Sequence, residues 1–265
     1  MRFGVNILNF GPGANPNALR HWAQVAEAVG YDFAMISDHV AVTPDVAAQY
    51  PEPFYDPFVT LAWLAGQTKR IELGTTVTIL PYRHPFHTAR MAANIDHLSG
   101  GRFILGVGVG WAKQEFAALG VPFEKRGALT NQYLETILDS WVTDAHPLRA
   151  PHPPIWVGGS SEAAIRRAVL YGDAWHPLRF QADWLEHEAL PALRRIAEDY
   201  GKPVPAFCPR IKLHSLDQAR ADIEALERLG AGAILLDTYT GKPESTLHPE
   251  KDWEMLIRLL GQLRP

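Results

Sequence analysis

The sequence has little cysteine, little excess charge and no long apolar run, and each shortage argues against a class of protein. Cys208 is the single cysteine among 265 residues, so an internal disulfide is excluded, as in a reducing compartment. A formal net charge of −4 and a pI near 6.3 give no basis for binding nucleic acid or an anionic membrane. No apolar run approaches the roughly 20 residues that cross a bilayer, and the first residues do not resemble a signal peptide. We therefore expect a soluble, cytoplasmic protein.

Signatures of several enzyme classes are also missing. The 11 histidines are scattered, and neither His84 with His87 nor His146 with His152 has a carboxylate nearby in a ligand pattern, so we expect no metal site. The Gly-x-Ser-x-Gly turn of hydrolases is absent, and no Gly-Lys-Ser/Thr marks a P-loop. What is present is a chain with 47% hydrophobic residues, enough for a large buried core.

Strand-like and helical segments alternate along the chain about eight times without a polar linker. The segments that we expect to be strands are residues 2–9, 31–37, 71–80, 101–111, 154–157, 173–176, 210–214 and 233–237. Helical periodicity follows them at residues 17–29, 58–67, 85–98, 112–119, 126–141, 161–171, 182–200, 216–229 and 250–263. Such alternation predicts parallel strands with right-handed crossovers. The length fits one (β/α)₈ TIM-barrel domain over residues 1–265, and a doubly wound open α/β sheet is the competing architecture.

In such a barrel, functional residues lie where strands end and the following loops begin. Asp38 and His39 stand at the end of the second strand. A histidine beside a carboxylate can exchange protons near neutral pH, so both are candidates for catalysis or for contact with a bound ring. The alternative is that Asp38 caps the next loop and His39 is a packed polar residue. Neighbouring side chains of a strand face opposite ways, so the two need not share a role.

The fourth predicted strand carries glycine at every second position, Gly106, Gly108 and Gly110, and ends at Trp111. Because side chains alternate across a strand, these glycines leave one face of it bare. A bare face beside an aromatic side chain favours a planar ligand, and tight packing inside a barrel explains the spacing equally well.

Two further strand ends have the composition of binding sites. In the third strand, Gly74 is followed by Thr75, Thr76 and Val77, which can host a bulge beside a ligand, although ordinary β-propensity also explains them. After the fifth strand, Gly158 and Gly159 lead to Ser160 and Ser161, one of which caps a helix. Free N–H groups at a helix N-terminus attract phosphate or carboxylate, so this loop is a candidate anion-binding site. The alternative is that the serine only caps the helix. Trp175, at the end of the sixth strand, is a candidate for the same site.

Together these residues resemble the luciferase-like monooxygenase superfamily, in particular its oxidoreductases that depend on the deazaflavin coenzyme F420. The similarity covers nearly the whole chain. It is carried by SDH at 37–39, LGTTV at 73–77, ARMAANIDHLSGGRFILGVGVGW at 89–111 and PIWVGGSSEAAIRRAVLYGDAW at 154–175.

The resemblance implies a (β/α)₈ barrel, a flavin or deazaflavin across the strand ends, and a homodimer. It implies a non-prolyl cis peptide at Thr76–Val77 that backs the ring, with Asp38 and His39 beside its reactive edge. It further implies that the Gly158, Gly159 and Ser160 loop holds the cofactor phosphate. Two departures from the sugar-phosphate dehydrogenases of this family matter. Trp111 stands where they carry a catalytic glutamate, and this chain has only Val and Thr where they carry a tryptophan shortly after the histidine, so that chemistry is not expected.

We therefore expect an enzyme that transfers hydride between bound F420 and an organic substrate, with His39 as the proton donor or acceptor. The runner-up is an FMN-dependent monooxygenase that uses reduced flavin and oxygen. A non-catalytic flavin-binding barrel, or a barrel hydrolase or isomerase that binds its substrate through the phosphate loop, is the alternative from a different class.

Overall fold

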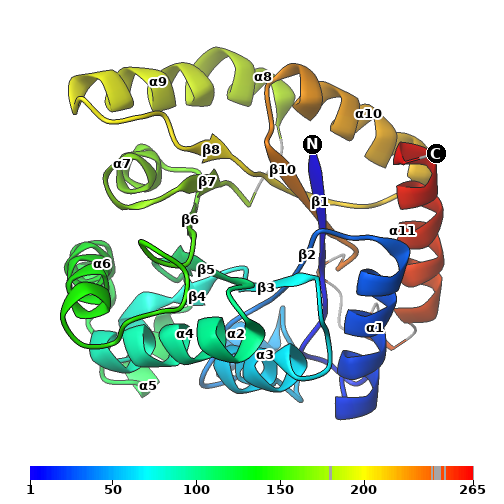
Figure 1. The fold of residues 1–265 in the computed structure, drawn as a ribbon, viewed down its shortest axis with the longest axis horizontal. Coiled ribbons are helices and arrows are strands. Elements are labelled where there is room, and N and C mark those ends of the chain that lie inside the picture. Colours follow the sequence, from blue (N-terminus) through cyan, green and yellow to red (C-terminus); the bar gives the residue numbers. More distant parts are fainter. Residues whose placement is uncertain (179–180, 240, 242–245, 248, 265) are drawn as a thin grey trace.

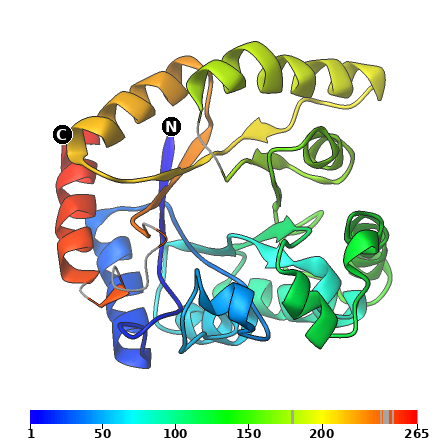
Figure 2. The same ribbon diagram turned by 180° about the vertical axis from the view of Figure 1, so that it is seen from behind.

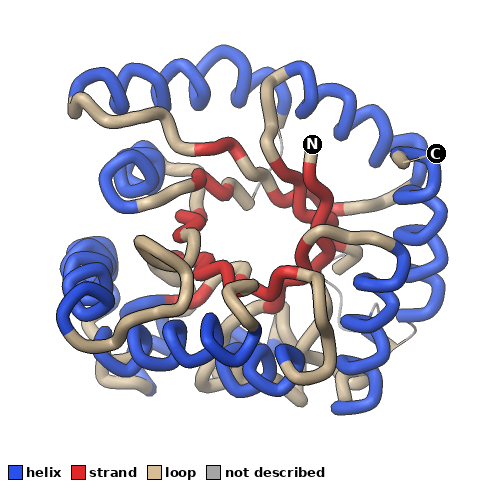
Figure 3. The backbone as a smooth tube through the Cα atoms, in the orientation of Figure 1, coloured by secondary structure: helices blue, strands red, loops and turns tan. Residues whose placement is uncertain are grey.

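A ring of parallel strands surrounded by helices makes up the computed structural model, which describes residues 1–178, 181–239, 241, 246–247 and 249–264 (Figures 1 and 3). The strands within this part are β1 (Arg2–Asn6), β2 (Phe33–Ile36), β3 (Glu72–Thr75), β4 (Thr78–Ile79), β5 (Phe103–Gly108), β6 (Ile155–Gly158), β7 (Ala174–His176), β8 (Ala206–Phe207), β9 (Arg210–Lys212) and β10 (Ala233–Asp237). They pair in the order β8-β7-β6-β5-β3-β2-β1-β10-β9, and β4 pairs with β5. Each of these pairings is parallel.

The two ends of this order, β8 and β9, are one strand interrupted at Cys208 and Pro209. Toward β7, the N–H of Cys208 donates to the carbonyl of Trp175 over 2.9 Å. Toward β10, the N–H of Leu235 donates to the carbonyl of Pro209, also over 2.9 Å. The segment therefore joins β7 to β10 and closes the ring. β3 and β4 likewise fill the place of a single strand in the ring, because both pair with β5. The ring therefore has eight strand positions, and the predicted (β/α)₈ barrel is confirmed.

Helices cover the outside of the ring on all sides (Figures 1 and 2). They are α1 (Pro16–Val29), α2 (Pro44–Ala47), α3 (Pro57–Ala65), α4 (Pro85–Ser99), α5 (Lys113–Ala118), α6 (Arg126–Thr143), α7 (Glu162–Tyr171), α8 (Ala182–Trp184), α9 (Leu190–Asp199), α10 (Leu216–Arg228) and α11 (Pro249–Leu263). Short 3₁₀ turns at Leu80–Tyr82 and Phe123–Lys125 and a π turn at Leu185–Ala189 complete the helical structure. In the described part of the chain, no helix combines the length and apolarity that spanning a membrane requires.

Local sequence explains where the first helix begins and ends. The side chain of Asn15 accepts a hydrogen bond from the N–H of Ala18, and Pro16 occupies the first helical position. Gly30 ends the helix with a φ of 99°, a conformation that suits glycine. Between these signals Leu19, Ala23 and Ala26 are buried against the sheet.

The two larger of three apolar clusters in the described part of the chain lie on opposite faces of the strands, because side chains alternate along each strand. The larger of these two lies between the strands and the helices. The smaller fills the inside of the ring and consists of Phe33, Met35, Ile104, Trp156, Ala174, Cys208, Ala233 and Leu235. Burial raises the pKa of the Cys208 thiol to about 12, which fits packing and not nucleophilic chemistry. Since these residues fill the middle of the barrel, a ligand has room only at its ends.

Candidate functional site

An open cavity of about 240 Å³ lies at the carboxyl ends of the strands. Its walls come mainly from the ends of β2, β4, β5 and β6 and from the start of β9. The lining residues are Ser37, Asp38, His39, Tyr50, Thr76, Val77, Ile79, Gly108, Val109, Gly110, Trp111, Gly158, Gly159, Leu178 and Arg210. The cavity thus brings together the strand ends that the sequence picks out.

A bulge separates β3 from β4 within the strand predicted at residues 71–80, at the threonines that can host one. The peptide between Thr76 and Val77 is cis, as the family resemblance implies. The hydroxyl of Thr75 donates to the carbonyl of Gly106 over 2.6 Å and ties the bulge to β5. Thr76 and Val77 face the cavity, whereas Thr75 is fully buried behind them.

The glycines of β5 make room for this bulge. A Cβ built on Gly106 would lie 1.8 Å from the carbonyl oxygen of Thr75, and one on Gly108 would lie 2.5 Å from a methyl of Val77. The face of β5 is therefore bare because the bulge packs on it, and Gly106 does not line the cavity. This corrects the expectation that Gly106 contacts a ligand. Gly108 and Gly110 do line the cavity, and their contact with a ligand stays a prediction. A Cβ on either would also lie within 2.7 Å of a side-chain methyl, so close packing accounts for the spacing at all three glycines.

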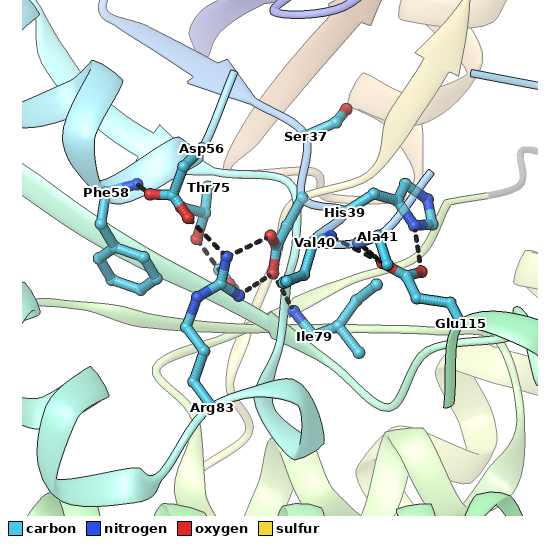
Figure 4. A network of polar contacts seen from close by, with 12 residues as sticks. Ser37, His39, Val40, Ala41, Asp56, Phe58, Thr75, Ile79, Arg83 and Glu115 are labelled. Atoms are coloured by element: carbon cyan, nitrogen blue, oxygen red, sulfur yellow. Dashed lines mark hydrogen bonds and ion pairs between the residues drawn. The ribbon is translucent and has the colours of Figure 1, made fainter. Parts of the chain in front are cut away.

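Asp38 is held in an ion pair with Arg83. Figure 4 labels Arg83 and its second partner, Asp56. Arg83 donates to both oxygens of Asp38 over 2.7 and 2.8 Å, and the N–H of Ile79 adds a third bond over 2.8 Å. Arg83 also donates to Asp56, which caps α3. Although burial by itself would lower the pKa of Arg83, the carboxylates of Asp38 and Asp56 outweigh it and raise that pKa. With its oxygens occupied, Asp38 orders the loop and is a poor proton carrier.

His39 faces a different carboxylate, that of Glu115 on α5 (Figure 4). Its Nδ1 lies 2.6 Å from Glu115 Oε2, and both side chains are buried. The other oxygen of Glu115 accepts hydrogen bonds from the N–H groups of Val40 and Ala41 over 2.6 and 3.0 Å. Burial would raise the pKa of Glu115, but the hydrogen bond from His39 and those from the backbone lower it overall. Glu115 is therefore an ionised carboxylate inside the protein.

A second polar network crosses the floor of the cavity from β9 to the bulge. Arg210 pairs with the buried carboxylate of Asp237 over 2.7 Å and donates to the carbonyl of Thr76 over 3.1 Å. His176 lies 3.0 Å from the hydroxyl of Thr76 and is also bonded to the carbonyl of Cys208. Burial lowers the pKa of His176 to about 4, so its ring is neutral. The network therefore holds Thr76 both by its carbonyl and by its hydroxyl.

The glycine loop after β6 forms another wall of the cavity. Gly158 and Gly159 line it, and Gly159 has a φ of +113°, which favours glycine. Ser161 caps α7, since its side chain accepts a hydrogen bond from the N–H of Ala164. Of the two candidate capping serines, the structure thus selects Ser161, and Ser160 lies in the turn before it without lining the cavity.

Trp175 lies outside the cavity, which corrects its expected contact with a ligand. Its ring is fully buried among Trp184 and Phe207, on the face of β7 that packs against helices. Its Nε1 donates to the carbonyl of Gly159 over 2.8 Å. Because the C=O and N–H of a trans peptide point opposite ways, this bond turns the N–H of Ser160 away from Trp175.

Several residues of the site escape detection in the sequence. Glu115 and Arg83 carry the charges that pair with His39 and Asp38. Arg210 and His176 hold Thr76 by its carbonyl and its hydroxyl, and Tyr50 lines the cavity. Glu115 stands in the apolar stretch QEFAAL, and a carboxylate among apolar residues was the available signal. Its partner could not be read from the sequence, because 76 positions separate it from His39. Among the described residues, no cluster of three or more His, Cys, Asp or Glu side chains could hold a metal ion.

Comparison with known proteins places this geometry in context. The sequence profile of the family described as luciferase-like monooxygenase matches residues 1–251. A protein of Mycobacterium tuberculosis, provisionally named a coenzyme F420-dependent oxidoreductase, is 31% identical over 182 residues, or 55% of this chain and 52% of that protein.

Two solved structures share the whole fold at low sequence identity. An F420-dependent secondary alcohol dehydrogenase in complex with an F420–acetone adduct has a TM-score of 0.80 at 15% identity, covering 100% of this chain and 99% of its own. The oxygenating constituent of a 3,6-diketocamphane monooxygenase of Pseudomonas putida, in complex with FMN, has a TM-score of 0.76 at 16% identity, covering 98% and 96%. At such identities the similarity demonstrates a common fold alone.

Proposed function

This chain belongs to the luciferase-like monooxygenase family, and we propose that it is an oxidoreductase that transfers hydride between coenzyme F420 and a small organic substrate. One observation carries the proposal. A single cavity is bounded by the Thr76–Val77 bulge, by the glycine loop after β6 and by His39. A support for a planar ring, an anion-binding turn and a titratable group therefore face the same space.

The glycine loop suits the phosphate of such a cofactor. A Cβ on Gly159 would lie 2.9 Å from the Cβ of Ala164 in the first turn of α7, so the loop lies close against that turn. The N–H of Ser160 is turned away from Trp175, and α7 adds the positive end of its dipole. The backbone from Gly159 to Ser161 would hold the phosphate group.

The other walls suit an uncharged ring. Val77, Gly108 and Gly110 present apolar or bare surface, and the charged side chains that line the cavity are already paired within the protein. These are Asp38 with Arg83, His39 with Glu115, and Arg210 with Asp237. A bound deazaflavin supplies a carbon that accepts or gives up a hydride. The residues of this chain would orient the ring, keep the bulge rigid and move a proton at His39.

The relative from Mycobacterium tuberculosis supports F420 in preference to other cofactors, because its name includes this coenzyme. An FMN-dependent monooxygenase is the second candidate, since the fold of the Pseudomonas putida protein holds FMN. A barrel that binds a flavin without catalysis is the third. We further propose that the enzyme is soluble and cytoplasmic and that it acts as a homodimer.

Titration of the purified protein with F420 and with FMN, followed by quenching of cofactor fluorescence, tests this assignment. We expect saturable binding of F420 at micromolar or lower concentration, and weaker binding of FMN. Binding of FMN alone would contradict the F420 assignment, and binding of neither cofactor would contradict the proposed function.

A matched pair of variants tests the phosphate loop in the same assay. Gly159→Ala introduces a side chain at a φ of +113° beside α7, and we expect it to weaken cofactor binding about tenfold or more. Gly201→Ala has the same type of backbone conformation, with a φ of +58°, but lies remote from the cavity with nothing within 4 Å of the added atom. It should leave binding unchanged. Equal losses in both variants would show that backbone strain, and not the loop, controls binding.

A further inference from the structure

The contact between His39 and Glu115 defines the position of the proton on the histidine ring. Glu115 is ionised, so its oxygens accept hydrogen bonds and cannot donate them. The nitrogen of His39 that lies 2.6 Å away, Nδ1, must therefore carry the hydrogen. In the neutral ring, the second nitrogen, Nε2, then has a free lone pair.

Glu115 is itself held so that it cannot turn away from this contact. Its Oε1 accepts the N–H groups of Val40 and Ala41, the two residues that follow His39. Its side chain is fully buried at the start of α5, and Phe116 beside it packs against Tyr82. The carboxylate thus fixes the histidine ring and the backbone after it as one unit.

Aromatic side chains fix the other faces of the His39 ring. Tyr50 lies against it with ring centroids 5.1 Å apart, while Phe54 and Trp111 meet it edge to face at 5.5 and 5.8 Å. His39, Tyr50 and Trp111 line the cavity, whereas Glu115 does not. Among the described residues, Glu115 is the hydrogen-bond partner recorded for the His39 ring, so Nε2 is the ring nitrogen left for a ligand.

The other titratable groups near this pair stay in one protonation state around neutral pH. Burial raises the pKa of Tyr50, and the nearby charges of Arg210 and Asp237 modify it in opposite directions. Burial raises the pKa of Tyr82 beside Glu115, and the charge of Glu115 raises it further.

Two charged groups complete the surroundings of the pair. Asp38, the residue before His39, is paired with Arg83. Asp45 on α2 is held by hydrogen bonds to Thr43 and Gln114, which lower its pKa against the effect of burial.

We propose that Glu115 is the positioning residue for proton transfer by His39: it holds Nδ1–H, so that Nε2 exchanges a proton with the substrate oxygen. The inference rests on the proposed function. When a hydroxyl-bearing carbon is oxidised, its C–H bond breaks and both electrons leave with the hydride to the oxidised deazaflavin. The O–H proton passes to Nε2 and the carbonyl π bond forms, while the resulting imidazolium lies beside the Glu115 carboxylate. Reduction of a carbonyl reverses each transfer.

NMR of the protein labelled with ¹⁵N-histidine tests this arrangement, because a protonated ring nitrogen and a bare one resonate far apart. The His39 signals are assigned by their loss in His39→Gln. When the His39 ring of the wild-type protein is neutral, we expect its one N–H proton to lie on Nδ1. In Glu115→Gln, the amide oxygen can still accept from Val40 and Ala41, while its NH₂ group faces His39. The proton should then move to Nε2, a change that a merely structural role of Glu115 does not predict.

Glu124→Gln is the matched control, since Glu124 is exposed on the turn after α5 and should leave the His39 tautomer unchanged. A wild-type proton on Nε2, or the same tautomer in wild type and Glu115→Gln, would overturn the proposal. The wild-type spectrum decides the question even where Glu115→Gln does not fold.

Binding of F420, measured by fluorescence, separates this inference from the proposed function. Glu115 does not line the cavity, so Glu115→Gln should bind F420 within about twofold of the wild-type affinity. If neither the wild type nor Glu115→Gln bound F420, the proposed function would be contradicted. The role of Nε2 would then be contradicted as well, whichever nitrogen of His39 carries the proton. Loss of binding in the variant alone would show that Glu115 shapes the cofactor site and would overturn its assignment as a positioning residue.

Discussion

Two neighbouring residues, Asp38 and His39, have different roles because each meets a different partner. Arg83 holds Asp38 from one side, and Glu115 holds His39 from another. In the first pair the carboxylate comes from the loop after β2 and the cation from the segment before α4. In the second, the histidine supplies the titratable ring and α5 supplies the carboxylate. Adjacent positions at the end of a strand therefore separate a structural ion pair from a candidate proton carrier.

At the same scale, the buried ring of His176 gives stability a defined pH dependence. Burial lowers its pKa to about 4 from an ordinary value of 6.5. Between these pH values the unfolded chain binds more protons at this site than the folded chain does, so the free energy of unfolding falls as the pH falls. The contribution is fully present above pH 6.5 and is lost toward pH 4. We expect it to amount to about 3 kcal/mol.

Urea denaturation at several pH values between 4 and 7 measures this contribution. His176→Gln removes the titrating ring, so its stability should depend less steeply on pH in this interval than that of the wild type. His214→Gln, a change at an exposed histidine, should leave the steepness unaltered. Parallel pH dependences for wild type and His176→Gln would contradict the expectation.

At the scale of elements, strand β5 and the bulge between β3 and β4 form one packing unit. A side chain at position 106 would meet backbone, the carbonyl oxygen of Thr75, at 1.8 Å. A side chain at position 108 would meet only a methyl of Val77, at 2.5 Å. Because backbone yields less easily than the end of a side chain, the two glycines differ in what they permit.

We expect Gly106→Ala to lower the free energy of unfolding by about 3 kcal/mol or more, and Gly108→Ala to lower it by about 1 kcal/mol. Denaturant unfolding of the two variants checks this order. Gly261→Ala is the control: it lies within α11 with nothing within 4 Å of the added atom. There, alanine should raise stability by about 0.5–1 kcal/mol. A smaller loss at position 106 than at 108 would show that β5 and the bulge separate easily.

At the scale of the whole molecule, closure of the ring decides which residues meet. The segment from Ala206 to Lys212 pairs with β7 on one side and with β10 on the other. This brings Arg210 to the Thr76 peptide across 134 positions of sequence. We infer that residues 1–265 form one domain, because the ring cannot close without strands from both ends of the chain.

The outer surface carries apolar side chains that bear on assembly. Val59 and Trp63, four residues apart on α3, are 72% and 37% exposed, and Phe86 at the start of the adjoining α4 is 53% exposed. Neighbouring exposed apolar side chains favour an interface between molecules. We expect a homodimer that uses this face.

Sedimentation velocity measures the assembly. The wild type should sediment as a dimer, and Val59→Glu should shift it toward the monomer, because a buried charge opposes association. Val142→Glu, at a position 75% exposed on α6, is the matched control and should remain dimeric. A monomeric wild type would contradict the expected assembly.

The amino-acid sequence alone determined the alternation of strands and helices, the family, and most of the strand ends that line the cavity. All three follow from local periodicity and short motifs. Asp38, His39, Thr76, Val77, Gly108, Gly110, Trp111, Gly158 and Gly159 all reach the predicted cavity. Only the tertiary structure decided that Gly106 packs against the bulge, that Trp175 faces the helices and that Glu115 faces His39. Each of these three contacts depends on the direction in which a residue points and on a partner that lies far away in the sequence. Such contacts form only when the barrel closes, so local sequence cannot specify them.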